Sequence, residues 1–381
     1  MAVERGYEVA MLDWLACAVG GSGEPAASAA REAATGLGGR VAALGVAGHV
    51  LDFDDTYLPG LAHLSATTAP AALAVAADRG ASVGEVLEAF AGGFEAMGAL
   101  ARAGHPALYD GGWHPTAVCG SVGAAVCAAR LSGLGPAEWK AAVGFALLRS
   151  AGLRSSFGSD GKAIGVGLAA ASGVEGAALA RGGARIDLDR AARGPGGYQE
   201  AFGARFALRG ESPAVAENWI KAYPCCLQTH GAIEAAVAAR ESGVNGHLRV
   251  VLHPLSLQAA PIAGPTDGLE AKFSIPYLTA FALLRGAPGP ADFAAVDGEV
   301  ALFASEHVEV VADDGLLESE ARLEADGDEV ARVEAALGSP LRPMTEDQLA
   351  AKRRALAGDR LEGALEDRDR PAAELLARLG L

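Results

Sequence analysis

Pro70-Ala-Ala-Leu-Ala-Val-Ala-Ala-Asp-Arg-Gly80-Ala-Ser82-Val-Gly-Glu85 is the stretch that best indicates how this chain folds. Alanine and leucine favour helix, and proline is tolerated at a first helical position, so Pro70 predicts the start of a helix that Gly80 ends. Ser82 followed three residues later by Glu85 is a capping box, which predicts that another helix begins there. The stretch therefore predicts two antiparallel helices joined by a short loop.

The same pattern recurs from Glu8 to about Ala180. A helix is expected after Trp113-His114-Pro115, ending near Gly133, and Gly135-Pro136 predicts the start of the next one. The chain has 381 residues, of which 51 are glycine and only 6% are aromatic, and its apolar residues are mostly alanine. This composition favours thin helices that pack closely through small side chains.

The pattern changes in the second half of the chain. Residues 184–217 have little periodicity and predict a long connecting loop. Alternating apolar residues then predict strands, and these lie among shorter helices; the strands are 248–253, 307–311 and 318–324, and the helices are 227–239 and 275–284. From Thr345 the helical pattern returns. We predict a mainly α fold: a helical domain made of 1–217 and 343–381, with a smaller α+β domain, 218–342, inserted as a lid.

The net charge of −16 disfavours binding to nucleic acid or to anionic membranes. An apolar stretch at 112–129 contains a histidine, a proline and several glycines, and is expected to be a buried helix rather than a membrane span. Five cysteines without paired spacing predict neither disulfides nor a zinc site. With no signal-peptide pattern, we expect a cytoplasmic protein with reduced thiols.

The first candidate site is His49-Val-Leu-Asp52-Phe-Asp54-Asp55-Thr56, followed by His63. Three carboxylates within four residues repel one another and need compensation. One interpretation is a solvated helix cap. A second is a divalent metal site similar to that of terpene cyclases, although Leu58 interrupts that motif. The third is an acid/base cluster that includes His63.

The second candidate is Gly111-Gly-Trp-His114-Pro115-Thr116. Pro115 at a first helical position places His114 just ahead of a helix N-terminus, which disfavours the imidazolium and favours a neutral imidazole that can accept a proton. A neighbouring aspartate would have the opposite effect. A histidine that makes only a structural hydrogen bond is the alternative.

Three lysines in apolar or glycine-rich surroundings are the third set: Lys162, Lys221 and Lys272. They could bind the carboxylates of an anionic substrate, or be surface lysines whose stems cover apolar surface. His230 would lie on the helix that follows Lys221. The chain lacks the P-loop, the nucleophile elbow and the His-Glu-x-x-His motif, so nucleotide, serine-hydrolase and zinc-protease functions lose support.

Taken in order, these segments resemble the MmgE/PrpD family, which includes 2-methylcitrate dehydratase and cis-aconitate decarboxylase. The resemblance covers most of the chain through 49–56, 70–74, 112–117, 123–134, 221–230 and 271–277. It implies a helical domain made from both chain ends, an inserted α+β lid, a site in the cleft between them, a homodimer, and no organic cofactor. We also expect no metal. By matching position, it implies these site residues: Asp52, Thr56, His63, His114 and Tyr277 as catalytic, and Lys162, Lys221 and Lys272 as substrate-binding.

The chain also departs from the family pattern. Gly165 stands where many relatives have a histidine three residues after the lysine, and His63 is followed by leucine rather than proline. These differences concern the substrate more than the fold.

The resemblance predicts a lyase, a dehydratase or decarboxylase, that acts on a small di- or tricarboxylate. Lysines would bind the carboxylates while a base removes the proton alpha to one of them, and His114 or Tyr277 would act as the acid. Asp52 would orient a histidine, either His63 or His114. An isomerase or epimerase with the same site, and a non-catalytic carboxylate-binding relative, are the alternatives.

Overall fold

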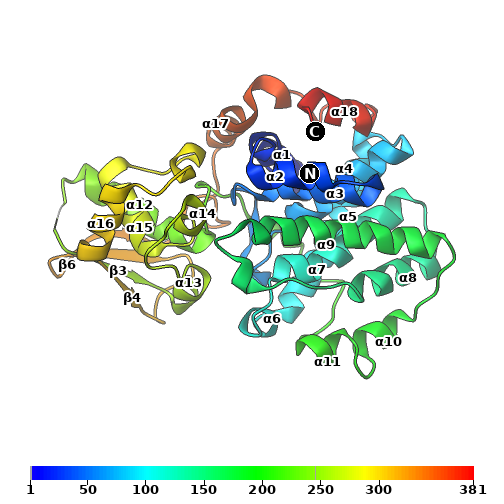
Figure 1. Ribbon diagram of the computed structural model, residues 1–381, viewed down its shortest axis with the longest axis horizontal. Coiled ribbons are helices and arrows are strands. Elements are labelled where there is room, and N and C mark those ends of the chain that lie inside the picture. The colour runs from blue at the N-terminus through cyan, green and yellow to red at the C-terminus, as the bar shows by residue number, and fades with distance from the viewer. Residues whose placement is uncertain (1, 245) are drawn as a thin grey trace. The chain divides into compact units, whose positions relative to one another are not determined.

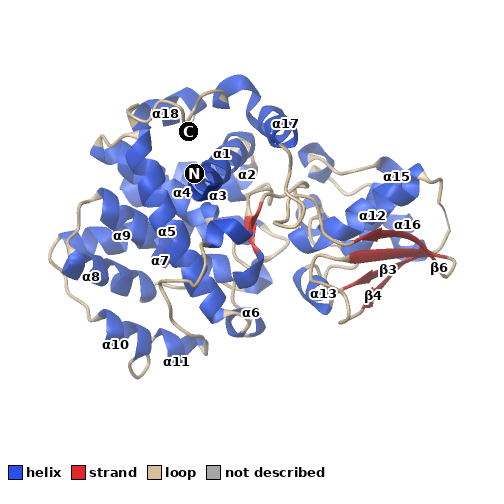
Figure 2. Ribbon diagram, turned by 180° about the vertical axis from the view of Figure 1, so that it is seen from behind, coloured by secondary structure: helices blue, strands red, loops and turns tan. Residues whose placement is uncertain are grey.

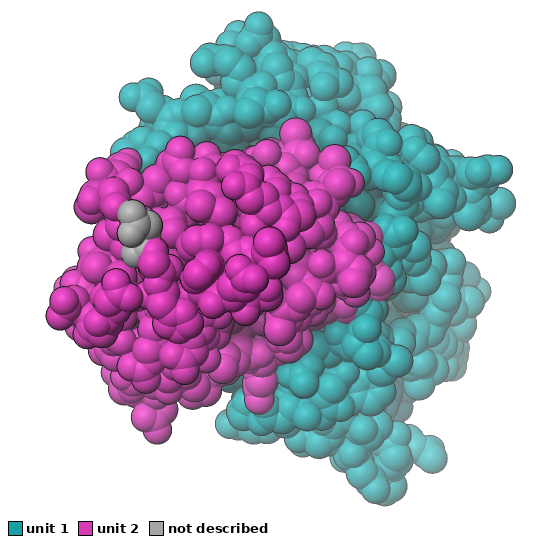
Figure 3. All heavy atoms as spheres, turned by 60° about the vertical axis from the view of Figure 1, so that its left-hand side comes forward, with its two compact units in different colours: residues 1–156, 160–220, 345–381 teal, residues 157–159, 221–344 magenta. Residues whose placement is uncertain are grey.

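Helices make up most of the chain in the computed structural model, which describes residues 2–244 and 246–381 (Figure 2). The predicted mainly α fold is confirmed. Contacts divide the chain into two compact units (Figure 3). The helical unit contains residues 1–156, 160–220 and 345–381, and the smaller unit contains 157–159 and 221–344. The boundaries predicted from the sequence followed residues 217 and 342. That the smaller unit acts as a lid stays a prediction.

The helical unit is built from thirteen described helices and one short pair of strands. Its helices are α1 (Ala2–Gly21), α2 (Pro25–Ala33), α3 (Gly36–His49), α4 (Ser65–Arg79), α5 (Val83–Gly104), α6 (Ala107–Asp110), α7 (Pro115–Leu131), α8 (Pro136–Leu147), α9 (Asp160–Arg181), α10 (Leu188–Arg193), α11 (Tyr198–Phe202), α17 (Glu346–Ala357) and α18 (Ala372–Leu379). Strands β1 (Thr56–Tyr57) and β2 (Asn218–Trp219) pair antiparallel.

Helix α7 lies in the core of this unit, packed against α4, α5, α8 and α9 (Figure 1). Residues 115–129 of α7 are buried without exception. The close packing through small side chains expected from the composition is present between α7 and α9. A Cβ atom added at Gly173 on α9 would lie 2.2 Å from the Ser121 carbonyl oxygen on α7. Glycine therefore lets these two backbones approach.

This packing predicts opposite effects for two glycine substitutions on α9. Gly173→Ala should destabilise the fold by several kcal/mol, because its Cβ would overlap the α7 backbone. At Gly165 an added Cβ meets nothing within 4 Å, so Gly165→Ala should stabilise α9 by about 0.5–1 kcal/mol through helix propensity. Urea unfolding of both variants checks the difference. Equal stabilities would show that α7 and α9 are less closely packed.

Helix α9 is long and apolar enough to cross a membrane by composition, and 67% of its most apolar window is buried within the protein. It packs against α3, α7 and α8, and this packing accounts for its composition. The apolar stretch at 112–129 forms most of α7, which is likewise buried, as expected.

The smaller unit contains a four-stranded sheet in the order β4-β3-β5-β6. The strands are β3 (Leu248–Leu252), β4 (Val308–Ala312), β5 (Ala321–Ala325) and β6 (Asp328–Val333). Strand β3 pairs parallel with β4 and antiparallel with β5. The helices are α12 (His230–Glu241), α13 (Pro254–Ala259), α14 (Gly268–Ala271), α15 (Ile275–Arg285) and α16 (Gly298–His307). Helix α12 packs on β5, β6 and α15, which gives the unit its own core.

Two expectations from the sequence were wrong in detail. Helix α4 begins at Ser65, so Pro70 lies inside it rather than at its start. The earlier start is stabilised because Ser65 donates to the Asp55 carboxylate from both its backbone nitrogen and its hydroxyl. Residues 184–217 are not a plain loop. They contain α10, α11 and a 3-10 turn, Ala214–Glu217, that comes directly before β2.

Candidate functional site

The acidic cluster lies on the connection from the end of α3 to β1, and it is buried. Asp52 is 4% exposed, while Asp54 and Asp55 are 0% exposed, which excludes a solvated helix cap. Asp52 has a φ of +53°, in the left-handed region that aspartate tolerates better than most residues. Carboxylates buried in this way require positive or hydrogen-bonding partners.

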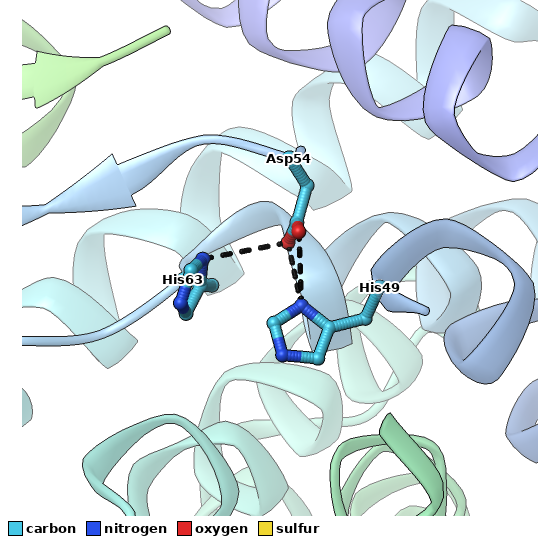
Figure 4. A group of neighbouring side chains, drawn as sticks. All are labelled: His49, Asp54 and His63. Carbon is cyan, nitrogen blue, oxygen red and sulfur yellow. Dashed lines mark hydrogen bonds and ion pairs between the residues drawn. The ribbon is translucent and has the colours of Figure 1, made fainter. Parts of the chain in front are cut away.

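The partners form a four-residue network of Asp54, His49, Lys162 and Asp52. Both oxygens of Asp54 lie 2.9 Å from His49 Nδ1, and Asp54 lies between His49 and His63 (Figure 4). Lys162 Nζ lies 2.9 Å from His49 Nε2 and 2.6 Å from Asp52 Oδ1. A consistent arrangement of protons has His49 donating from Nδ1 to Asp54 and accepting from Lys162 at Nε2.

Asp55 faces other partners and holds the segment in place. It accepts hydrogen bonds from Ser65 on α4 and from the Asn218 side-chain amide on β2 at 2.8 Å. Burial, followed by the nearby Asp54, raises the pKa of Asp55 to about 7. Asp55 therefore braces the segment.

The raised pKa of Asp55 predicts a pH dependence of stability. Between about 4 and 7 the folded state holds a proton on Asp55 that the unfolded state has lost, so this group lowers stability as pH rises. Asp55→Asn removes that contribution. The stability of Asp55→Asn relative to the parent should increase from pH 5 to pH 7, by up to about 1.4 kcal/mol per pH unit. A pH-independent difference in urea unfolding would contradict the raised pKa.

His63 lies beside the network with its ring fixed by the backbone. Its Nδ1 donates to the Asp55 carbonyl oxygen at 2.7 Å, lies 3.4 Å from Thr56 Oγ1, and is 3.7 Å from Asp54 Oδ2. The His63 backbone nitrogen donates to Thr116 Oγ1 on α7 at 3.0 Å. These contacts place a proton on Nδ1 and fix the orientation of the ring.

His114 is the N-cap residue of α7 and is 2% exposed. Its ring stacks with that of His49 at a centroid distance of 6.3 Å. Burial, and then the charge of Lys162, lowers the pKa of His114 well below its usual value. Burial likewise lowers the pKa of His49. The neutral imidazole expected for His114 from its position before a helix is therefore supported, with burial as the larger cause.

Three of these side chains could hold a metal ion. Donor atoms of His49, Asp54 and His63 lie within 4.8 Å of one another, and histidine with carboxylate suits several divalent metals. Protons account for the same geometry, because each Nδ1 donates to an oxygen, of Asp54 or of the Asp55 backbone. Metal-independence of the protein stays a prediction.

The remaining predicted site residues lie in the smaller unit. Lys221 and Lys272 are 1% and 4% exposed, so neither is a surface lysine. Lys272 Nζ lies 4.9 Å from the centroid of the Phe293 ring. The Tyr277 hydroxyl oxygen accepts a hydrogen bond from the Asp297 backbone nitrogen at the start of α16. Tyr277 thus has a structural contact within the unit, and its role as an acid stays a prediction.

The geometry adds a second carboxylate to the sequence-based assignments. Asp52 pairs with Lys162, and Asp54 is a carboxylate bound to His49. That Asp52 orients His63 or His114 stays a prediction. His49 and Asp54 belong to the first candidate segment, but the resemblance assigned neither of them a role. Their spacing of five residues across the end of α3 was a possible signal, because a turn after a helix brings such residues together.

The chain is similar in sequence to known proteins over most of its length. Sequence models of the MmgE/PrpD N-terminal and C-terminal domains match residues 41–209 and 223–378. Cis-aconitate decarboxylase from Homo sapiens is 28% identical over 271 residues, and that from Mus musculus is 28% identical over 267 residues; each match covers 64% of this chain and 54% of the relative. The chain thus matches about half the length of these curated relatives. The two matched domains include the four-residue network, His63, His114 and the lysines of the smaller unit, and the chain belongs to the MmgE/PrpD family.

Proposed function

We propose that the chain is a lyase that removes CO2 or water from a small tricarboxylate, with cis-aconitate as the first substrate to test. The buried four-residue network is the observation that carries the proposal. It places an ammonium group, Lys162, within hydrogen-bond distance of an imidazole that is itself bound to a carboxylate. Hydrogen-bonded side chains of this kind can attract a substrate carboxylate and can redistribute charge when a proton is transferred nearby.

Decarboxylation of cis-aconitate shows what the site must supply. The carboxylate on the methylene carbon leaves as CO2, and the electron pair of the broken C–C bond forms a new C=C bond. The former vinyl C–H carbon then takes up a proton. The reaction therefore needs a cation for the developing charge and an acid at that carbon.

The residues of the helical unit can take these roles. Lys162 would stabilise the negative charge that develops on the substrate, with Asp52 and His49 holding its Nζ. His114 or His63 would transfer the proton at carbon. For a dehydration of a β-hydroxy acid, the neutral His114 would instead remove the proton alpha to a carboxylate, since its lowered pKa keeps it able to accept one. The electron pair of the C–H bond would form the C=C bond, and the β-hydroxyl, protonated by an acid such as His63, would leave as water.

The smaller unit would contribute further parts of the site. Lys221, Lys272 and Tyr277 would contribute to binding and catalysis from the smaller unit. No cofactor is required for the proton transfers described. A cytoplasmic homodimer is also proposed, on the family resemblance alone.

The proposal is tested with cis-aconitate, citrate and 2-methylcitrate in deuterated buffer. Proton NMR follows conversion and carbon-bound deuterium, and ultraviolet absorbance follows the double bond. We expect net conversion of at least one acid to a decarboxylated or dehydrated product. Deuterium exchange without conversion would instead indicate an isomerase, and binding of every acid without exchange would indicate a carboxylate-binding protein; either result overturns the lyase assignment.

A further inference from the structure

The helical unit contains a second buried lysine that the proposed chemistry does not use. Lys352, on α17, has an Nζ atom 2.7 Å from Asp13 Oδ1 on α1 and 2.7 Å from the Phe53 carbonyl oxygen, to which it donates. The same atom lies 4.0 Å from the centroid of the Phe53 ring. Its side chain is 3% exposed. A residue 299 positions later in the chain therefore binds the acidic segment.

Phe53 lies between the two aspartates that form the ends of the four-residue network. Its carbonyl belongs to the peptide that joins it to Asp54, so turning that peptide moves Asp54 relative to Asp52. On the other side, Asp52 has its φ at +53°. A left-handed conformation in a residue other than glycine persists only where surrounding contacts hold it. The bond from Lys352 is such a contact.

We propose that Lys352 is a positioning residue for the candidate active site. By holding the Phe53 carbonyl, it keeps Asp54 against His49 and Asp52 against Lys162. The C-terminal segment, 345–381, thereby contributes to the site through the backbone of the acidic segment. This inference rests on the proposed function for its kinetic readout only, since the geometry of His49 can be followed without a substrate.

A purely structural role is the competing explanation, in which Lys352 and Asp13 only join α17 to α1. The two roles depend on different contacts of one ammonium group. Asp13→Asn removes the charge of the ion-pair partner and leaves the bond from Lys352 to Phe53. Lys352→Met removes both contacts but leaves the Asp13 carboxylate buried without its partner. The double variant Asp13→Asn/Lys352→Met also removes both contacts and leaves no unpaired buried charge, so it should be the more stable of the two.

The kinetic experiment compares these variants on the acid that the parent protein converts in the substrate panel. We expect Lys352→Met and the double variant to lower kcat on the order of 100-fold, as small misplacements of catalytic groups do, with KM changed by less than about threefold. Asp13→Asn should retain kcat within about threefold. Lys352→Gln, which can still donate to Phe53, should recover most of the loss. Equal losses in Asp13→Asn and Lys352→Met would overturn the positioning role.

A spectroscopic experiment tests the same inference without turnover. The His49 proton that lies between Nδ1 and Asp54 should give a downfield proton NMR signal, assigned by its absence in His49→Gln. We expect this signal to move upfield or broaden in the double variant and to remain in Asp13→Asn. An unchanged signal in the double variant would overturn the inference. An inactive parent protein with the expected NMR changes would instead overturn the proposed function alone.

Discussion

Lys162→Met is expected to lower kcat/KM for the tricarboxylate by about 100- to 1,000-fold, the effect of removing one preorganised group that stabilises developing charge. Lys162 is 6% exposed and donates to both His49 and Asp52. Among the described residues, Lys162 is the only lysine that contacts both His49 and Asp52, so its loss would remove this ammonium group from the network. Steady-state kinetics with the best substrate of the panel measures the effect.

The variant also affects stability, and this effect must be separated from catalysis. Removing Lys162 leaves Asp52 buried without its ion-pair partner, which should cost about 3–5 kcal/mol. Lys162→Met/Asp52→Asn removes that unpaired charge, and asparagine tolerates the left-handed conformation of residue 52. We expect the double variant to regain stability but not activity. Lys140 is exposed, so Lys140→Met is the matched control for the loss of a lysine outside the site. Activity that returned with stability would contradict a catalytic role for Lys162.

His114→Gln should lower kcat by about 100- to 10,000-fold, the usual contribution of a general acid or base. Glutamine keeps a polar side chain of similar length at this buried N-cap position, so stability should change by less than about 2 kcal/mol. Burial lowers the pKa of His114 well below its usual value, which favours the neutral imidazole. Mild acidification should therefore leave the parent's proton-accepting group uncharged.

To separate a catalytic role of His114 from a structural one, kcat and the midpoint of unfolding are measured on the same sample of His114→Gln. A folded, inactive variant supports the proton-transfer role. A variant that remains active while losing several kcal/mol of stability would show that His114 is a structural cap of α7. The pH–rate profile adds a further check, because loss of His114 should also remove any limb that its titration produces.

The helical framework could be predicted from local chemistry. The capping box at Ser82 and Glu85, the stop at Gly80 and the start at Pro136 are all present. These signals depend on neighbours in sequence. The start of α4 does not, because Ser65 is held by the Asp55 carboxylate, ten residues earlier. Tertiary contact therefore allowed the helix to begin before Pro70.

The sequence indicated candidate residues for the site, but it did not indicate which of them contact one another. His63, His114 and Lys162 each lie near His49, and Lys162 also pairs with Asp52. The catalytic and binding roles that the resemblance implies for them stay predictions. The sequence alone could not show which aspartate contacts which basic side chain. Asp52 has a left-handed backbone conformation, which changes the direction of the chain in a way that the residue spacing does not predict. Asp54, which the cap interpretation would expose to solvent, is instead buried and binds His49.

We propose that the four-residue network lets this chain cleave a small tricarboxylate. The most direct test is the release of labelled CO2 from cis-aconitate carrying 13C in the methylene-bound carboxyl group, followed by NMR for the parent and for Lys162→Met/Asp52→Asn. If cis-aconitate is the substrate, the parent releases labelled CO2 and takes up one solvent proton at carbon per turnover, while the folded double variant releases it at least about 100-fold more slowly. Equal rates in the two proteins would contradict the account.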